Sequence, residues 1–431
     1  MNYTCELERI LAEQYRRYPC MQVQDAVKLI YQNEFGGGHM ISDREESLAR
    51  LRDEYASVTG RDSELPWNGA CMETLNSKAH AGTGDERGAA GTGIGTVCGD
   101  TGAGHGEAVT GCDAEGADVY GMSAGSKGAH AAVPLFEDIG NGLCRINLAG
   151  LGRYPVSLET VNNFFIHTAN THRGDIKSFE RKLEILRDCC ARGALPFSVG
   201  SVDEYIRSYR GNGYPPVSHS AIYRDAYHPA YRIVKNDFRR YFEVFCRIDE
   251  LLGRVDSCRY SRNYVTVAIE GNCCAGKTSL AALLEQVYDC NVFHMDHFFL
   301  TPELRTEERL NETGGNVDYA RFRDEVIQGI ESGGEFEYRV YNCSMQAMER
   351  TVRVRPKKLN IVEGSYSMHP TLSEHYDLSV FLAVDPEEQS RRILERNGPV
   401  MHRRFMEEWV PKENRYFEEF RIASKCDIVI K

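Results

Sequence analysis

The chain lacks any run of apolar residues long enough to cross a membrane, which takes about 18 residues. Its strongest apolar run, residues 378–384, has the length of a β-strand. An excess of basic residues is lacking too, because 51 Lys and Arg face 63 Asp and Glu, for a net charge of −12. Proteins that coat nucleic acid or anionic membranes carry the opposite balance. We therefore expect neither a membrane nor a nucleic acid as a partner.

Cysteine is abundant, but the spacing that zinc sites use is missing. The 15 cysteines include the adjacent pairs Cys189-Cys190 and Cys273-Cys274, and no two of them are spaced as Cys-x-x-Cys. Adjacent cysteines rarely bridge each other, and structural zinc sites need paired short spacings. The first residues include early acids and no apolar core, unlike a secretion signal. These features indicate reduced thiols in a cytoplasmic protein.

Large apolar side chains are nearly absent from residues 81–130. Of these 50 positions, 15 are Gly and 9 are Ala. A segment of this composition buries too little surface to offset the entropy lost on ordering. We predict a flexible Gly/Ala-rich insertion over residues 56–130. It interrupts an N-terminal domain made of residues 1–55 and 131–253, whose function the sequence leaves open.

Apolar residues recur at helical spacing in that N-terminal domain. The pattern predicts a helix that ends at Phe35 and further helices over residues 178–190 and 235–253. We therefore expect a mainly helical, α+β, domain. Two histidines, His167 and His172, lie five residues apart in it and fit either metal ligation or ordinary packing.

From residue 262 to residue 431, short β-rich runs alternate with helical patterns. The predicted strands cover residues 265–270, 292–295, 359–362, 378–384 and 427–430. Near-continuous apolar strands separated by helices indicate a parallel sheet that is covered on both faces. The C-terminal half is therefore expected to be a separate α/β domain.

A glycine-rich phosphate-binding motif lies between the first predicted strand and a helical pattern. Residues 271–278 read Gly-Asn-Cys-Cys-Ala-Gly-Lys-Thr, which fits Gly-x4-Gly-Lys-Ser/Thr. Backbone N–H groups in such a loop surround phosphate oxygens, Lys277 reaches the β- and γ-phosphates, and the Thr278 hydroxyl binds Mg²⁺. The predicted ATP-binding residues are Gly271, Asn272, Cys273, Cys274, Ala275, Gly276, Lys277, Thr278 and Ser279. The two loop cysteines serve either as spacers or as redox-active thiols.

Acidic residues follow two of the predicted strands. Asp296 comes after residues 292–295, where it can accept the proton of an attacking hydroxyl or, alternatively, cap a helix or form a structural ion pair. Glu363 ends another strand and suits a group that acts on Mg²⁺ directly or through its water. A basic helical pattern with Arg391, Arg392 and Arg396 follows residues 378–384. It fits either a lid over the phosphates or a solvated charged helix.

In order and spacing, these motifs resemble the uridine kinase/phosphoribulokinase family of P-loop small-molecule kinases. The resemblance covers residues 264–431 and includes Asn316-Val-Asp318-Tyr-Ala-Arg-Phe, Tyr338-Arg-Val-Tyr341 and Cys426-Asp-Ile-Val-Ile. It implies an α/β fold of the P-loop NTPase type, with flanking helices around a parallel sheet. Where such kinases are expected to carry an acceptor-binding carboxylate, this chain has Asn342.

The resemblance also implies roles for individual residues. Asp296 is the catalytic base, assisted by Lys277, and the three arginines belong to the lid. The resemblance places the acceptor near Asp318 and Tyr341. His297 and Arg305 are further candidate contacts, although residues 300–309 differ from the nucleoside-binding pattern of uridine kinases. Thr278 and Glu363 are the candidate metal ligands.

The sequence thus predicts a kinase that uses ATP and Mg²⁺ and phosphorylates a hydroxyl of a nucleoside-like or other small polar acceptor. The alternative is a nucleotide-switched regulator, in which ATP binding and slow hydrolysis change how the N-terminal domain contacts a partner. A kinase needs an acid that faces an acceptor, whereas a switch needs only a group that positions water.

Overall fold

The structure, a computed structural model, describes residues 3–37, 40–60, 134–257 and 259–431. Most of the predicted insertion, residues 61–130, lies outside the described residues. Its first residues are described, and they differ from the prediction. Helix α3 (Arg44–Thr59) continues through residues 56–59 and ends at Gly60, whose φ of 65° provides the left-handed C-cap. The helical pattern therefore extends beyond the predicted start of the insertion.

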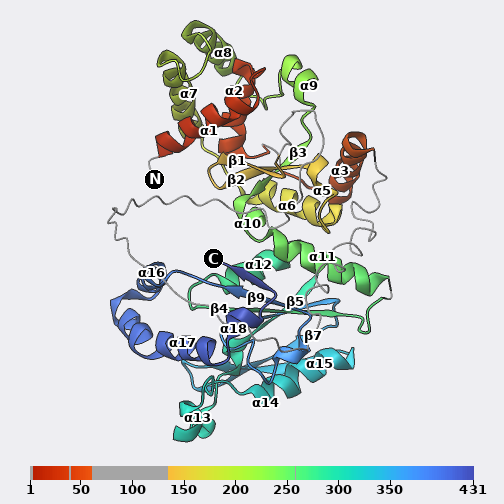
Figure 1. Cartoon of the computed structure of the whole chain (residues 1–431), viewed down its shortest axis with the longest axis vertical. Coiled ribbons are helices and arrows are strands. Elements are labelled where there is room, and N and C mark those ends of the chain that lie inside the picture. Colours follow the sequence, from red (N-terminus) through yellow and green to blue (C-terminus); the bar gives the residue numbers. More distant parts are fainter. Residues whose placement is uncertain (1–2, 38–39, 61–133, 258) are drawn as a thin grey trace, which may run out of the picture. The chain divides into compact units, whose positions relative to one another are not determined.

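The N-terminal half combines helices with one small antiparallel sheet (Figure 1). The sheet has the order β1-β2-β3 and consists of β1 (Phe136–Gly140), β2 (Leu143–Asn147) and β3 (Tyr231–Lys235). Besides α3, the helices are α1 (Tyr3–Arg17), α2 (Val23–Phe35), α5 (Leu148–Leu151), α6 (Leu158–Thr171), α7 (Ile176–Ala191), α8 (Val199–Gly211), α9 (Ala221–Tyr227), α10 (Asn236–Arg240) and α11 (Phe242–Asp256). The expected α+β character is confirmed.

Local sequence signals explain where these helices begin and end. Asp175 starts α7 by accepting a hydrogen bond from the Ser178 backbone N–H (2.8 Å), as an N-cap does. The helix predicted over residues 235–253 exists as two pieces. It is interrupted at Tyr241, which has φ −102° and ψ 16°, between α10 and α11.

The C-terminal half is built on a five-stranded parallel sheet with the order β10-β9-β4-β8-β5. Its strands are β4 (Val265–Gly271), β5 (Cys290–His294), β8 (Leu359–Glu363), β9 (Leu378–Leu382) and β10 (Ile428–Ile430). They correspond to the five predicted strands. In the centre, Val267 pairs with Ile361 of β8 and Leu378 of β9. The expected P-loop NTPase-type α/β architecture is confirmed.

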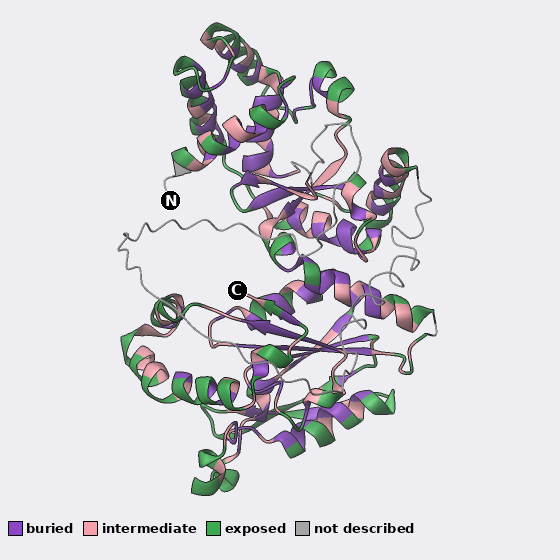
Figure 2. Ribbon diagram, viewed as in Figure 1, coloured by how far each residue is buried: buried purple, intermediate pink, exposed green. Residues whose placement is uncertain are grey.

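Side chains of β4 alternate between two hydrophobic cores, one on each face of the sheet. Val267 and Ile269 pack in one core with Leu284 and Phe245, whereas Ala268 belongs to the other core. Every residue of β4, β8 and β9 is buried, and these strands form the buried centre of the sheet in Figure 2. Burial on both faces is the reason that these strands read as continuous apolar runs.

Further elements surround this sheet. An antiparallel hairpin, β6 (Phe336–Asn342) and β7 (Ala347–Val354), was not predicted. The helical elements are α12 (Lys277–Val287), η2 (Met295–Phe298), η3 (Pro302–Leu304), α13 (Glu307–Asn311), α14 (Tyr319–Phe322), η4 (Arg323–Ile327), α15 (Gln328–Ser332), η5 (Ser373–His375), α16 (Pro386–Arg404), η6 (Phe405–Trp409), α17 (Val410–Glu419) and α18 (Ile422–Lys425). Across the described residues, no helix combines the length and the hydropathy needed to span a bilayer.

Candidate functional site

The phosphate-binding motif forms a tight loop between β4 and α12. Gly271 and Gly276 adopt φ values of 142° and 102°, which glycine adopts readily. A Cβ atom on Gly271 would lie 2.1 Å from the Leu382 carbonyl oxygen, so the loop passes β9 too closely for any side chain. Helix α12 begins at Lys277 and contributes the free N–H groups of its first turn. The loop therefore has the backbone form of an anion-binding site.

Lys277 is buried and folds back onto its own loop. Its Nζ atom donates to the carbonyl oxygens of Gly271 (2.7 Å) and Asn272 (3.0 Å) and to Ser365 Oγ (3.2 Å). No carboxylate among the described residues forms an ion pair with it. A phosphate group can therefore replace these neutral partners without breaking an ion pair.

The two predicted metal ligands lie beside this lysine. Thr278 Oγ1 is 3.3 Å and 3.4 Å from the two carboxylate oxygens of Glu363, at the end of β8. A hydroxyl and a carboxylate at this spacing fit two positions of a Mg²⁺ shell. In the described ranges, no group of three or more His, Cys, Asp and Glu side chains forms a metal site. A Mg²⁺ ion at Thr278 and Glu363 would therefore need phosphate oxygens and water to complete its shell.

His294 is an additional partner of Glu363 that the sequence analysis did not assign. Its Nδ1 atom lies 2.5 Å from Glu363 Oε1, and this hydrogen bond raises the pKa of His294. The histidine lies at the C-terminal end of β5, which pairs with β8, so His294 faces Glu363 in the ladder. Strand pairing alone brings the two side chains together.

Asp296 follows β5 in the short helix η2 and opens to solvent. Among the described residues, its carboxylate has neither a hydrogen-bond partner nor an ion-pair partner, so it neither caps a helix nor forms a structural ion pair. Desolvation by the protein around it, followed by the charge of Glu363, raises its pKa even though one side stays open. Both effects make this carboxylate a better proton acceptor than an ordinary aspartate.

The predicted acceptor residues divide into two groups. Arg305 and Tyr341 come together, because Arg305 donates from Nη2 to the Tyr341 hydroxyl (3.3 Å) and from Nε to the Leu300 carbonyl (3.0 Å). Asp318 instead caps α14 by accepting from the Arg321 backbone N–H (3.1 Å).

His297 is the remaining candidate acceptor contact. Its ring stacks on that of Tyr338 with centroids 6.0 Å apart. Burial, together with the charge of His294, lowers its pKa to about 4. His297 is therefore neutral at pH 7 and can donate or accept one hydrogen bond.

The three candidate lid arginines also differ. Arg392 donates to the Cys274 carbonyl (3.2 Å), and the positive charge of Arg396 helps to lower the pKa of the Cys274 thiol. Arg391 is exposed and pairs with Glu388 (2.6 Å) and Glu395 (2.5 Å) of its own helix. The structure therefore brings two of the three to the phosphate loop.

Glu413 in α17 supports the loop from a distant part of the sequence. Its carboxylate accepts from the Cys273 backbone N–H (3.0 Å) and from Ser365 Oγ (2.5 Å), and Ser365 in turn contacts Lys277. No sequence signal marks Glu413, because it lies 140 residues from its loop partner. Glu270 was not predicted either, although the sequence offers a signal for it. It is a charged residue that follows an apolar run and directly precedes Gly271, the first residue of the phosphate-binding motif.

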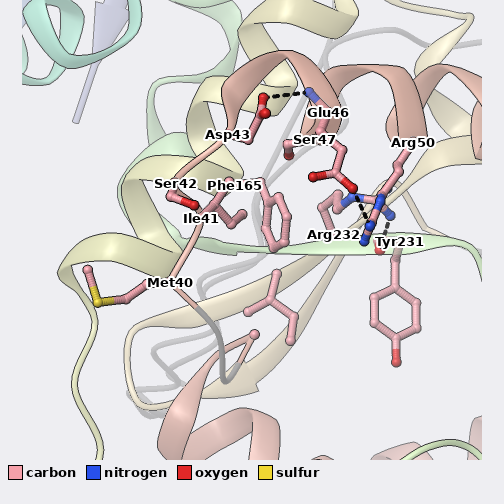
Figure 3. Close-up of a pocket in the computed structure, with 12 residues that line it drawn as sticks. Met40, Ile41, Ser42, Asp43, Glu46, Ser47, Arg50, Phe165, Tyr231 and Arg232 are labelled. Carbon is pink, nitrogen blue, oxygen red and sulfur yellow. Dashed lines mark hydrogen bonds and ion pairs between the residues drawn. The ribbon is translucent and has the colours of Figure 1, made fainter.

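A separate pocket of about 460 Å³ lies in the N-terminal half, between α3, α6 and β3 (Figure 3). Its volume is in the range of small-molecule sites. Phe165, Glu46 and Arg232 gather around it, and its two arginines are paired. Arg50 binds Glu46 (2.5 Å), and Arg232 binds Glu54 (2.5 Å). His167 and His172, the two candidate metal ligands of this half, do not line the pocket.

Comparisons with known proteins give structural likenesses only. No protein-family model and no curated protein matches the chain. A possible uridine kinase from Bacillus stearothermophilus has 19% identity and a TM-score of 0.31, over 42% of this chain and 100% of that one. A candidate fructose transport system kinase from Silicibacter sp. TM1040 has 21% identity and a TM-score of 0.34, over 42% and 97%. TT1252 from Thermus thermophilus has 19% identity and a TM-score of 0.21, over 38% and 87%.

Proposed function

We propose that the C-terminal half is an ATP- and Mg²⁺-dependent kinase that transfers the γ-phosphoryl group to a hydroxyl of a nucleoside-like or other small polar acceptor. The observation that carries the proposal is the Asp296 carboxylate. It lacks a partner among the described residues and lies close enough to Glu363 for their charges to interact. An unpaired acid beside a phosphate loop supports the orientation and deprotonation of an acceptor hydroxyl.

The loop backbone and Lys277 would hold the phosphates of ATP. Lys277 exchanges two loop carbonyls for phosphate oxygens, and Ser365 keeps its ammonium group aimed at the loop. Thr278 and Glu363 would hold Mg²⁺, which when bound offsets negative charge on the β- and γ-phosphates.

Asp296 would orient the acceptor hydroxyl and receive its proton. The hydroxyl oxygen forms a bond to the γ-phosphorus while the bond to the leaving oxygen of ADP breaks. Arg392 and Arg396, which approach the loop at Cys274, would neutralise charge on the transferred group. Arg305 and Tyr341 would contact the acceptor beyond its reacting hydroxyl.

A panel of acceptors tests this proposal directly. The protein is incubated with MgATP and nucleosides, sugars or small alcohols, and products are followed by phosphorus NMR. A phosphate-ester signal that requires both an acceptor and Lys277 is expected. The Lys277→Ala variant is the control, because the Lys277 ammonium group donates hydrogen bonds to the loop and to Ser365 and to no other described residue. Phosphate release at one rate with and without acceptors would contradict the proposal.

One observation favours the nucleotide-switched regulator as a second candidate. Helix α12 begins at the phosphate loop, and its far end contacts the N-terminal half. Asn163 Nδ2 donates to the Val287 carbonyl (2.8 Å), and the hydroxyl of Tyr288, which follows α12, donates to Asp249 (2.8 Å). A nucleotide that shifts α12 would therefore act on these contacts. Nucleotide-dependent changes in N-terminal hydrogen exchange without acceptor phosphorylation would support this candidate.

A further inference from the structure

Two adjacent thiols lie inside the phosphate loop. The sulfur atoms of Cys273 and Cys274 are 3.9 Å apart, with the Cys273 thiol donating toward Cys274. Both side chains are partly exposed. Cys274 adopts a left-handed φ of 60°, which side chains other than glycine rarely adopt. The proposed phosphoryl transfer uses neither sulfur.

The charges around the two thiols differ in sign. Arg396 and Lys277 act on Cys274, whereas on Cys273 the carboxylate of Glu413 has a larger effect than Lys277. The hydrogen bond from Cys273, together with these cations, lowers the pKa of Cys274 to about 6 against the opposing effect of burial. The same hydrogen bond, followed by desolvation and Glu413, raises the pKa of Cys273. The pair at neutral pH is therefore one thiolate and one thiol.

We propose that Cys274 is a modification site, a thiolate that reacts with small disulfides and other thiol-directed electrophiles, and that bound ATP shields it. Its sulfur attacks one sulfur of the disulfide, a new S–S bond forms at Cys274, and the other half of the reagent leaves as a thiolate. The adduct would occupy space beside Arg396 and Lys277 that the phosphates need. The shielding, unlike the reactivity, rests on the proposed ATP site.

The reactivity is tested on the full chain with a limiting amount of 5,5′-dithiobis(2-nitrobenzoic acid), an aromatic disulfide. Labelled peptides are identified by mass spectrometry. At pH 6 about half of Cys274 is thiolate, against about 0.3% of an ordinary thiol with pKa near 8.5. The lower basicity of Cys274 costs roughly a factor of ten in nucleophilicity. We therefore expect it to react about tenfold faster than an ordinary thiol.

Cys343 is the internal comparison, because it is an exposed cysteine in the same half whose pKa is raised by desolvation. We expect C274S to remove the fast labelling phase and C343S, the matched control, to retain it. The rate at Cys274 should level off above about pH 6, while that at Cys343 keeps rising. Labelling of Cys274 no faster than that of Cys343 would overturn the proposed thiolate and leave the proposed kinase untouched.

The shielding has its own measurement. Saturating MgATP should slow labelling of Cys274 about tenfold, and it should leave labelling of Cys5, an exposed cysteine in α1, unchanged. Fast labelling of Cys274 that MgATP does not slow would overturn the shielding. It would also count against the proposed ATP site, because the shielding depends on ATP binding beside Cys274.

Discussion

Among single residues, Glu270 holds the phosphate loop from behind. It is fully buried at the end of β4 and accepts hydrogen bonds from the backbone N–H groups of Gly271 (2.9 Å), Tyr366 (3.2 Å) and Met368 (3.1 Å) and from the Tyr416 hydroxyl (3.1 Å). Burial raises its pKa to about 7 in spite of these donors and Lys277. One carboxylate thus joins the loop, the segment after β8 and helix α17.

This pKa predicts how stability depends on pH. Because folded Glu270 keeps its proton up to about pH 7 while the unfolded residue loses it near its ordinary value, the free energy of unfolding should fall as pH rises between them. The slope contributed is up to about 1.4 kcal/mol per pH unit. Urea unfolding between pH 5 and 7.5 should give a flatter profile for Glu270→Gln. Glu337→Gln, at an exposed position of β6, is the control and should keep the wild-type slope.

At the scale of elements, substitutions of two adjacent arginines in α16 have different expected effects. Arg392→Ala removes a cation that contacts the loop, so kcat/KM should fall about 10- to 100-fold, the range of one charged hydrogen bond. Arg391→Ala removes a cation that pairs only within its helix, and a smaller loss is expected. Equal losses in steady-state kinetics would mean that the contact with Cys274 has no part in transfer.

The passage of the loop beside β9 makes a prediction about two glycines. Gly271→Ala places a Cβ against the Leu382 carbonyl and should lower the melting temperature sharply. Gly253→Ala lies in α11 with open space around the new methyl group, and alanine is favoured there by about 1 kcal/mol. Its melting temperature should rise slightly. Differential scanning calorimetry measures the melting temperatures of both variants. An unchanged melting temperature in Gly271→Ala would refute the close approach of the loop to β9.

Strand prediction succeeded where apolar residues dominate a short run, and it failed where polar or charged residues interrupt that run. The central strands β4, β8 and β9 are mostly apolar because both of their faces are covered, while the edge strands β5 and β10 are only partly buried. Strand β7 is exposed along nearly its whole length, so no apolar pattern marks it. Strand β2 is buried but includes Arg145, which pairs inside the fold with Glu137 (3.2 Å) and Gln32 (2.6 Å). A buried arginine lowers the mean hydropathy of its strand, so a prediction based on hydropathy misses that strand.

The site was predictable as far as local motifs extend. Gly271, Lys277 and Thr278 follow from one motif, and its helix and strand are present as expected. Partners separated by long stretches of sequence, such as Glu413 and the loop, depend on how α17 returns to the sheet. Spacing alone also predicted a lid role for Arg391. Adjacent residues of a helix point in different directions, and Arg391 forms its ion pairs within its own helix.

At the scale of the whole molecule, the Gly/Ala-rich segment should be dispensable for folding. Its composition supplies little apolar surface, and loop length costs only about 0.6 kcal/mol per doubling. Replacing residues 81–130 with a short Gly/Ser linker should therefore leave the melting temperature and ATP affinity nearly unchanged. Calorimetry and nucleotide titration measure both. A drop of many degrees would mean that the segment packs against the rest of the chain.

The most direct test of the account is the rate of phosphoryl transfer in Asp296→Asn. This change keeps the size of the side chain but removes its ability to accept a proton. With an acceptor from the panel, kcat should fall about 10²- to 10⁴-fold, with little change in KM for ATP. The variant should also lose the fall in rate at low pH that the raised pKa of Asp296 gives the wild type. Glu303→Gln, at an exposed acid nearby in η3, is the control. A wild-type rate and an unchanged pH profile in Asp296→Asn would contradict the proposed kinase.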